Sequence, residues 1–213
     1  MERVLPGQSG EDDRIVLGLL NSVEDGATSQ RRIAAELGIA LGLVNAYLKR
    51  CVTKGLIKVS EAPARRYAYY LTPKGFTEKS RLTVEYLSSS FSFFRQAKSD
   101  CADVFRIAQA RNFHNIVLVG KSDLAEIGIL SAADSGVSIV AVLDDGADGS
   151  EIIGKEIVSS YDELTTAFDA VVITDLRRAR QFFDDAVTRF GAQRVLAPRL
   201  LGLNVSGVEA SKS

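Results

Sequence analysis

The chain has 213 residues, of which 46% are hydrophobic and 25% are charged. This length suits two compact domains, and the composition is typical of a globular protein and excludes a disordered chain. No apolar run reaches the ~18–20 residues that cross a bilayer, and the first residues lack the apolar core of a signal peptide, so we expect a cytoplasmic protein without a membrane partner. Two cysteines, Cys51 and Cys101, exclude a disulfide framework, and with one histidine no metal site is expected.

The net charge of −1 conceals two segments of opposite sign. Residues 29–79 carry ten Lys or Arg and three Asp or Glu, whereas residues 99–213 carry eleven and seventeen. A basic segment favours a polyanionic partner, so we expect the first part of the chain to bind nucleic acid and the acidic part to have another role. Charge alone leaves open a basic face that only meets solvent.

Three helices are predicted in the first third of the chain. Apolar residues recur at helical spacing over residues 15–20, before a turn at residues 24–26. Ser29 stands where an N-cap belongs, ahead of a helix that Gly38 ends in a left-handed conformation. A further helix is expected over residues 41–54, with Gly55 after it. Two helices joined by a short glycine-containing turn indicate a helix-turn-helix.

The next residues favour a winged helix. Residues 56–60 and 67–71 are rich in β-branched and aromatic residues and predict two strands with a loop at 61–66, and Pro73 stands at the first position of a new helix. The sequence therefore predicts a winged helix-turn-helix, α+β domain over residues 12–75. A winged helix used only for protein contacts is the alternative.

Polar and small residues in this domain form a candidate interface with double-stranded DNA. Gly42 lets the second helix of the pair approach a major groove closely, where Asn45 can contact an adenine edge and Lys49 a guanine or a phosphate. A helix N-terminus and an arginine-tipped loop suit phosphates and a minor groove. The predicted DNA-binding residues are Ser29, Gln30, Arg31, Gly42, Asn45, Lys49, Arg50, Arg65 and Arg66.

Three runs in this region carry a family resemblance. Residues 37–49 (LGIALGLVNAYLK), 54–58 (KGLIK) and 67–75 (YAYYLTPKG) resemble the MarR-type winged-helix regulators associated with exopolysaccharide gene clusters. The resemblance covers residues 12–98, under half of the chain. It implies a DNA-binding transcriptional regulator, usually dimeric, and we expect a repressor of polysaccharide or nucleotide-sugar genes.

The helical pattern continues from Pro73 to about Lys98. Its apolar stripe is too long to be buried within an 80-residue domain, because a helix of this length extends ~40 Å. Pairing with a second copy would cover the stripe, so residues 76–111 are predicted to link the domains and to form a homodimer. Packing against the chain's own second domain is the alternative. The stripe consists of Phe76, Thr83, Leu87, Phe91 and Phe94.

Residues 112–205 follow a different pattern. Continuous apolar runs at 116–119, 139–142, 170–173 and 195–197 are typical of buried parallel strands, and helices are expected between them over 124–135, 160–167 and 176–190. Alternation of strands and helices predicts a doubly wound, parallel, Rossmann-like domain, which makes the chain α/β overall.

A ligand site is expected at the carboxyl ends of these strands, where open α/β sheets bind their ligands. The first strand leads into Gly120, Lys121 and Ser122, and the second into Asp144 and Asp145; Thr174 and Asp175 follow the third. One glycine, a lysine and an acid at ribose distance suit a nucleotide sugar. NAD(H) is the alternative, disfavoured because Ser122 replaces the glycine that lets a pyrophosphate approach. A bare α/β domain whose loops merely turn also remains open.

Two resemblances accompany this domain. Residues 116–125, 143–146, 153–158 and 161–173 resemble the Rossmann domain of nucleotide-sugar-modifying enzymes, and the domain order is similar to that of NADH-sensing Rex-type repressors. A Rex-like NAD(H)-responsive repressor and a nucleotide-sugar enzyme with an accessory winged helix are therefore alternatives. Because no G-x-S-x-G turn or metal-ligand spacing occurs, and residues 112–205 contain no Tyr-x-x-x-Lys pair, we expect no catalytic residues, no enzyme activity and no required cofactor.

Overall fold

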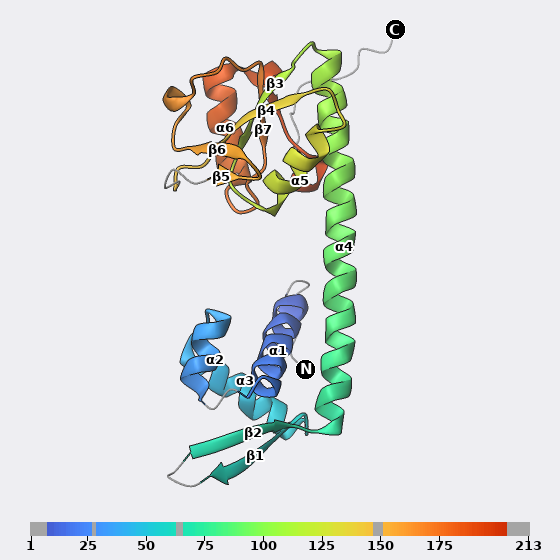
Figure 1. The fold of residues 1–213 in the computed structure, drawn as a ribbon, viewed down its shortest axis with the longest axis vertical. Coiled ribbons are helices and arrows are strands. Elements are labelled where there is room, and N and C mark those ends of the chain that lie inside the picture. Colours follow the sequence, from blue (N-terminus) through green and yellow to red (C-terminus); the bar gives the residue numbers. More distant parts are fainter. Residues whose placement is uncertain (1–7, 27–28, 63–65, 147–150, 204–213) are drawn as a thin grey trace. The chain divides into compact units, whose positions relative to one another are not determined.

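A computed structural model describes residues 8–26, 29–62, 66–146 and 151–203 (Figure 1). The chain forms two compact units, residues 1–91 and 92–213, whose boundary lies within a long helix. We describe each unit by itself. In the described part of the chain, no helix combines the length and the apolar character needed to span a membrane.

Three helices open the first unit: α1 (Gln8–Glu24), α2 (Gln30–Leu37) and α3 (Leu41–Thr53). Both predicted ends of α2 are confirmed. Ser29 is its N-cap and accepts a hydrogen bond from the Arg32 amide, and Gly38 ends it at φ 63°. The helices share an apolar core with the strands that follow them. Its buried residues are Leu17, Leu19, Leu20, Val23, Ile33, Val44, Leu48, Cys51, Leu56, Ile57 and Leu82.

An antiparallel hairpin follows, formed by β1 (Ile57–Ala62) and β2 (Arg66–Leu71), with Ile57 opposite Leu71. The next helix starts close to it, because a Cβ atom on Gly75 would lie 2.1 Å from the Leu56 carbonyl oxygen. The Thr72 hydroxyl donates to the Gly55 carbonyl and accepts from the Gly75 amide. Three helices, a hairpin and a following helix confirm the predicted winged helix.

Helix α4 (Pro73–Ala110) is one unbroken helix of 38 residues that begins at the predicted Pro73 (Figure 1). It contributes Leu82 to the core of the first unit. Its last turns belong to the core of the second unit, where Ala97, Cys101 and Phe105 are buried. Between these two ends, most side chains of α4 are exposed.

The second unit contains a six-stranded sheet in the order β5-β6-β4-β3-β7-β8. The four predicted strands are confirmed as β3 (Asn115–Val119), β4 (Ser138–Leu143), β7 (Ala170–Ile173) and β8 (Val195–Leu196), all parallel. The other two strands were not predicted. These are β6 (Lys155–Val158), parallel to β4, and β5 (Glu151–Ile152), an antiparallel edge strand, so the sheet is mixed rather than purely parallel.

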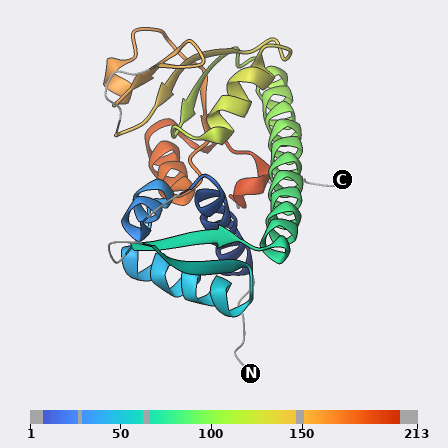
Figure 2. The same cartoon turned by 60° about the horizontal axis from the view of Figure 1, so that its bottom comes forward.

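Helices cover both faces of this sheet (Figures 1 and 2). Ile116 and Leu118 of β3 pack in one apolar core with α4 and α5 (Asp123–Ala132). Val117 and Val119, which point to the other face, pack in a second core with α6 (Ala179–Phe190). This alternation along a buried strand explains why the run is apolar throughout.

Two helix predictions in this unit need correction. No α-helix covers residues 160–167: a single 3₁₀ turn, η1 (Tyr161–Glu163), is followed by extended backbone at Leu164. The Glu163 carboxylate accepts from the Ser159 amide, which favours a local turn over helix continuation. The helix predicted from residue 176 begins at Ala179, because the Asp175 carboxylate accepts the Arg177 and Arg178 amides and forms a turn first.

Candidate functional site

The exposed face of α3 carries most of the predicted DNA contacts. Val44 and Leu48 are buried and fix the rotation of the helix in the core. Gly42 and Lys49 are exposed on the other side, and Asn45 is half-buried between them. A Cβ atom on Gly42 would meet nothing within 4 Å, so no packing inside the protein requires glycine there. This face of α3 is therefore open to solvent in the described residues.

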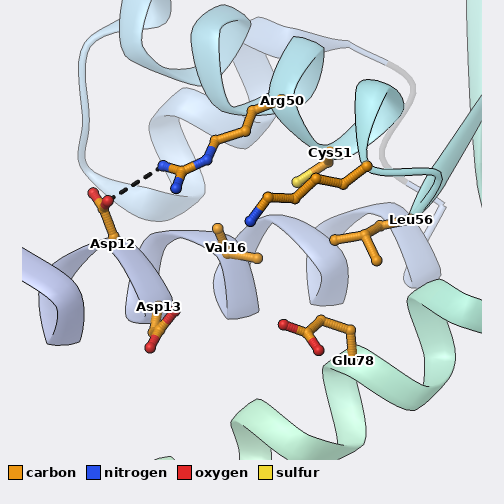
Figure 3. A pocket seen from close by; sticks show the side chains of 8 residues that line it. Asp12, Asp13, Val16, Arg50, Cys51, Leu56 and Glu78 are labelled. Carbon is orange, nitrogen blue, oxygen red and sulfur yellow. Dashed lines mark hydrogen bonds and ion pairs between the residues drawn. The ribbon is translucent and has the colours of Figure 1, made fainter. Parts of the chain in front are cut away.

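Arg50, which was also predicted to bind DNA, pairs with an acid of α1 (Figure 3). Its guanidinium lies 3.2 Å from the Asp12 carboxylate, which also accepts a hydrogen bond from the Tyr47 hydroxyl. The pKa of Asp12 is lowered mainly by the hydrogen bond from Tyr47 and, to a smaller extent, by Arg50. The same carboxylate raises the pKa of Tyr47 to about 12. Asp12 thus links α1 to α3 and forms an ion pair with the Arg50 side chain, which remains exposed.

A small cavity of about 30 Å³ lies beside this pair (Figure 3). Its walls are charged as well as apolar. That volume has room for about two water molecules. Cys51 is buried in the core of the unit, and this burial raises the pKa of its thiol. The cavity is lined by Asp12, Asp13, Val16, Arg50, Cys51, Lys54, Leu56 and Glu78.

The other predicted DNA contacts have different environments. The Gln30 amide donates to the Tyr69 hydroxyl of β2, at 3.1 Å, and ties α2 to the hairpin. Arg31 is exposed on the first turn of α2. Arg65 lies outside the described residues, and of Arg66 only the backbone, at the start of β2, is described.

The sequence of this unit matches a known domain. The model described as "Winged helix-turn-helix DNA-binding" matches residues 13–58. Residues 13–58 are a winged helix-turn-helix domain. No curated protein matches the chain. The solved structure "PigF with SAH" aligns with 90% of this chain, at 14% sequence identity and a TM-score of 0.24. The alignment covers 56% of the chain in that structure, so this chain spans just over half of its length. A likeness at that TM-score bears on neither the fold nor the function of this chain.

The carboxyl ends of β3, β4 and β7 bring several predicted ligand residues together in the second unit. A Cβ atom on Gly120, which has φ 103°, would lie 2.3 Å from the Asp175 Cβ and 2.5 Å from its amide nitrogen. Glycine is therefore required here by the neighbouring chain segment. The sequence had placed this glycine in a predicted nucleotide-sugar site.

Ser122 and Thr174 hold this edge of the sheet together. The Ser122 hydroxyl accepts from the Ala125 amide as the N-cap of α5 and donates to the Thr174 carbonyl at 2.6 Å. The fully buried Thr174 hydroxyl donates to the carbonyls of Val119 and Gly120. Both hydroxyls therefore have structural partners, which by itself explains the residue types.

Asp144 and Asp145 point to different partners. The Asp144 carboxylate accepts the backbone amides of Lys121 and Gly146, at 2.8 and 3.0 Å. The exposed Asp145 carboxylate accepts two hydrogen bonds of 2.6 Å from Arg178, and this pairing is the main cause that lowers its pKa. Asp145 thus links the loop after β4 to the start of α6.

Sequence reasoning missed two residues of these sites: Asp12 and Arg178. Asp12 lies 38 positions from Arg50, and Asp145 lies 33 positions from Arg178, so no local spacing reveals either pair. Asp175 was predicted to lie at the ligand site, and its carboxylate accepts the amides of Arg177 and Arg178 in the turn before α6. In the described part of the chain, no cluster of His, Cys, Asp and Glu could hold a metal ion.

Proposed function

We propose that this protein is a homodimeric DNA-binding regulator, a repressor of polysaccharide or nucleotide-sugar genes, in which α3 enters the major groove. One observation carries the DNA-binding part. The winged helix-turn-helix domain exposes Gly42 and Lys49 on the face of α3 opposite its buried side chains. Small and basic residues on a recognition helix favour close approach to base edges and phosphates.

Selection of bound duplexes from fragmented genomic DNA, followed by gel shift on the recovered sequences, tests this function. We expect Lys49→Ala to weaken binding to every sequence and to reduce the salt dependence, because a phosphate contact is lost. Asn45→Ala should instead relax preference at one base pair by about 1–3 kcal/mol. Equal affinity for all duplexes, or no binding at modest salt, would contradict the proposal.

The exposed apolar side of α4 supports a homodimer. Phe91 is 58% exposed, and Leu87 and Phe94 are each more than 40% exposed. Phe91→Lys should place a charge in the dimer interface and raise the dimer dissociation constant by about 100-fold or more. Phe93→Lys is the matched control, because Phe93 is also exposed but points to another side of the helix. Light scattering at micromolar concentration measures both; equal masses for the two variants would count against this interface.

For the second unit we propose a Rossmann-like sensor of a nucleotide sugar, with no enzyme activity. Its parallel strands lie in the order β6, β4, β3, β7, β8, which is the order third, second, first, fourth, fifth along the chain and the order of dinucleotide-binding folds. Helix α5 begins at Asp123, three residues after Gly120. Ser122 serves as the N-cap, so the proposed ligand contacts are Lys121 for a phosphate and Asp144 for a ribose. A carboxylate that accepts two amides retains acceptor capacity for a diol.

A thermal-shift panel of UDP-, GDP- and dTDP-sugars with NAD(H) and NADP(H) tests the sensor. A ligand present at 100 times its dissociation constant stabilises the folded state by about 2.7 kcal/mol. Asp144→Asn should abolish the shift, whereas Asp134→Asn, at an exposed residue after α5, should leave it unchanged. A shift with NAD(H) alone would favour the Rex-like alternative, and turnover of a nucleotide sugar would favour an enzyme. If no nucleotide shifts the melting temperature, the sensor proposal fails.

A further inference from the structure

One ion pair joins two loops at the carboxyl ends of the strands in the second unit. Asp145 follows β4, and Arg178 lies between β7 and α6. In the sheet, β3 lies between β4 and β7, so the pair connects the segments on either side of the end of β3. Open α/β sheets bind their ligands at the place where the strand order reverses, which here is the end of β3. The Asp145–Arg178 pair therefore lies at the proposed ligand site.

The guanidinium of Arg178 holds Asp145 with the geometry that suits a phosphate. Its two terminal nitrogens each donate a hydrogen bond of 2.6 Å to a different oxygen of the carboxylate. This fork of two parallel hydrogen bonds fits carboxylates and phosphates equally well. The ring of Phe182, a buried residue of α6, has its centre 4.6 Å from the guanidinium carbon. Contact with this ring orients the guanidinium before any ligand arrives.

The helix starts at this edge of the sheet already have acceptors from their own chain. In dinucleotide-binding folds the pyrophosphate lies at a helix N-terminus. Here the Ser122 hydroxyl accepts a first-turn amide of α5, and the Asp175 carboxylate accepts the Arg178 amide before α6. A phosphate bound at this edge would therefore depend on cationic side chains such as Lys121 and Arg178.

We propose that Arg178 binds a phosphate of the nucleotide ligand, and that Asp145 occupies this position until the ligand displaces it. This inference rests on the proposed sensor and adds a second phosphate contact together with an internal competitor. The side chains of Arg178 and Asp145 are 41% and 53% exposed, so a ligand reaches the pair from solvent. An exposed ion pair is weak, and a diphosphate carries more negative charge than one carboxylate, so the exchange is favourable. The exchange would also release the loop after β4 from the start of α6.

Calorimetric titration of the full-length chain with inorganic pyrophosphate, UDP, GDP and dTDP tests the exchange. Asp145→Asn removes the competing charge and should lower the dissociation constant of at least one probe about threefold or more. Arg178→Gln should raise it about tenfold or more, and Arg178→Lys, which keeps the charge without the fork, should fall between the two. Arg180→Gln and Asp184→Asn are the matched controls, because these residues form an exposed ion pair within α6, and both should bind like the unaltered chain.

Tighter binding by Asp145→Asn together with weaker binding by Arg178→Gln supports the exchange. An unchanged dissociation constant in either variant overturns it, as does the absence of binding by every probe. Circular dichroism reports whether each variant is folded, and Arg178→Lys carries the test if Arg178→Gln unfolds.

Failure of this inference is distinguishable from failure of the proposed sensor. If nucleotide sugars raise the melting temperature through Asp144 while the Arg178 and Arg180 variants bind alike, the sensor stands and the exchange is overturned. If the probes respond to Asp145→Asn and Arg178→Gln as expected but no nucleotide sugar raises the melting temperature, the phosphate site stands and the nucleotide-sugar sensor fails.

Discussion

At the scale of single residues, Gly42 and Gly120 differ in the space around their Cβ positions. The Cβ position of Gly42 is open, whereas that of Gly120 is filled by the backbone of Asp175. A side chain at the first is compatible with the fold, and a side chain at the second is not. Substitutions at the two positions therefore separate function from stability.

For Gly42, we expect Gly42→Gln to bind DNA at least about tenfold more weakly and to unfold no more easily than the unaltered chain. Glutamine adds bulk to the exposed face of α3 and raises helix propensity by about 0.5–1 kcal/mol over glycine. Gel shift and thermal unfolding measure the two effects. Gly42→Ala is the size control and should bind almost normally. Unchanged affinity with glutamine would show that this turn does not approach the duplex.

For Gly120, we expect Gly120→Ala to lower the free energy of unfolding of the second unit by about 3 kcal/mol or more. The added methyl group would overlap the Asp175 backbone, and the positive φ disfavours alanine. Gly154→Ala is the control, because Gly154 has φ 67° but open space around its Cβ position, so only about 1 kcal/mol is expected. Urea unfolding followed by circular dichroism compares them, and equal losses would contradict the steric reason.

At the scale of elements, a carboxylate joins the starts of two neighbouring strands. Asp169, just before β7, accepts the amides of Asn115 and His114, each at 2.8 Å. Both hydrogen bonds lower the pKa of Asp169 below its usual value, and the one from the Asn115 amide has the larger effect. The ionised form is therefore favoured in the folded state.

The second unit should accordingly lose stability in acid through Asp169. Because the folded pKa lies below the unfolded value of about 3.9, the contribution is complete above that pH and disappears as pH falls through the folded pKa. Solvent screening limits it to about 1 kcal/mol. Asp169→Asn should flatten the pH dependence of unfolding below pH 4, and Asp134→Asn should not. An unchanged acid limb in Asp169→Asn would refute this role.

The elements also show what the sequence could and could not predict. The β-branched runs identified four strands of the sheet, and caps such as Ser29 and Gly38 defined α2, because these signals are local. Strand β6 was missed because it is short and carries the charged Lys155 and Glu156 at the edge of the main sheet. The candidate sites were predicted in outline only, since pairs such as Asp145 with Arg178 join residues far apart in sequence.

At the scale of the whole molecule, α4 belongs to the cores of both units. Leu82 packs in the first unit and Phe105 in the second, and the exposed Leu87, Phe91 and Phe94 lie between them in the sequence. The proposed dimer and the proposed sensor would therefore act on the same element.

Sharing α4 also constrains how the protein can be divided or recombined. A fragment of residues 112–203 lacks Ala97, Cys101 and Phe105 and should expose the apolar face that they cover. We expect this fragment to aggregate and a fragment of residues 92–203 to fold, as judged by size-exclusion chromatography and circular dichroism. Comparable behaviour of the two would contradict this expectation. In evolution, an exchange of the sensor between regulators would then have to carry half of the helix with it, so viable gene fusions should join inside α4, near residue 91, rather than at the loop before β3.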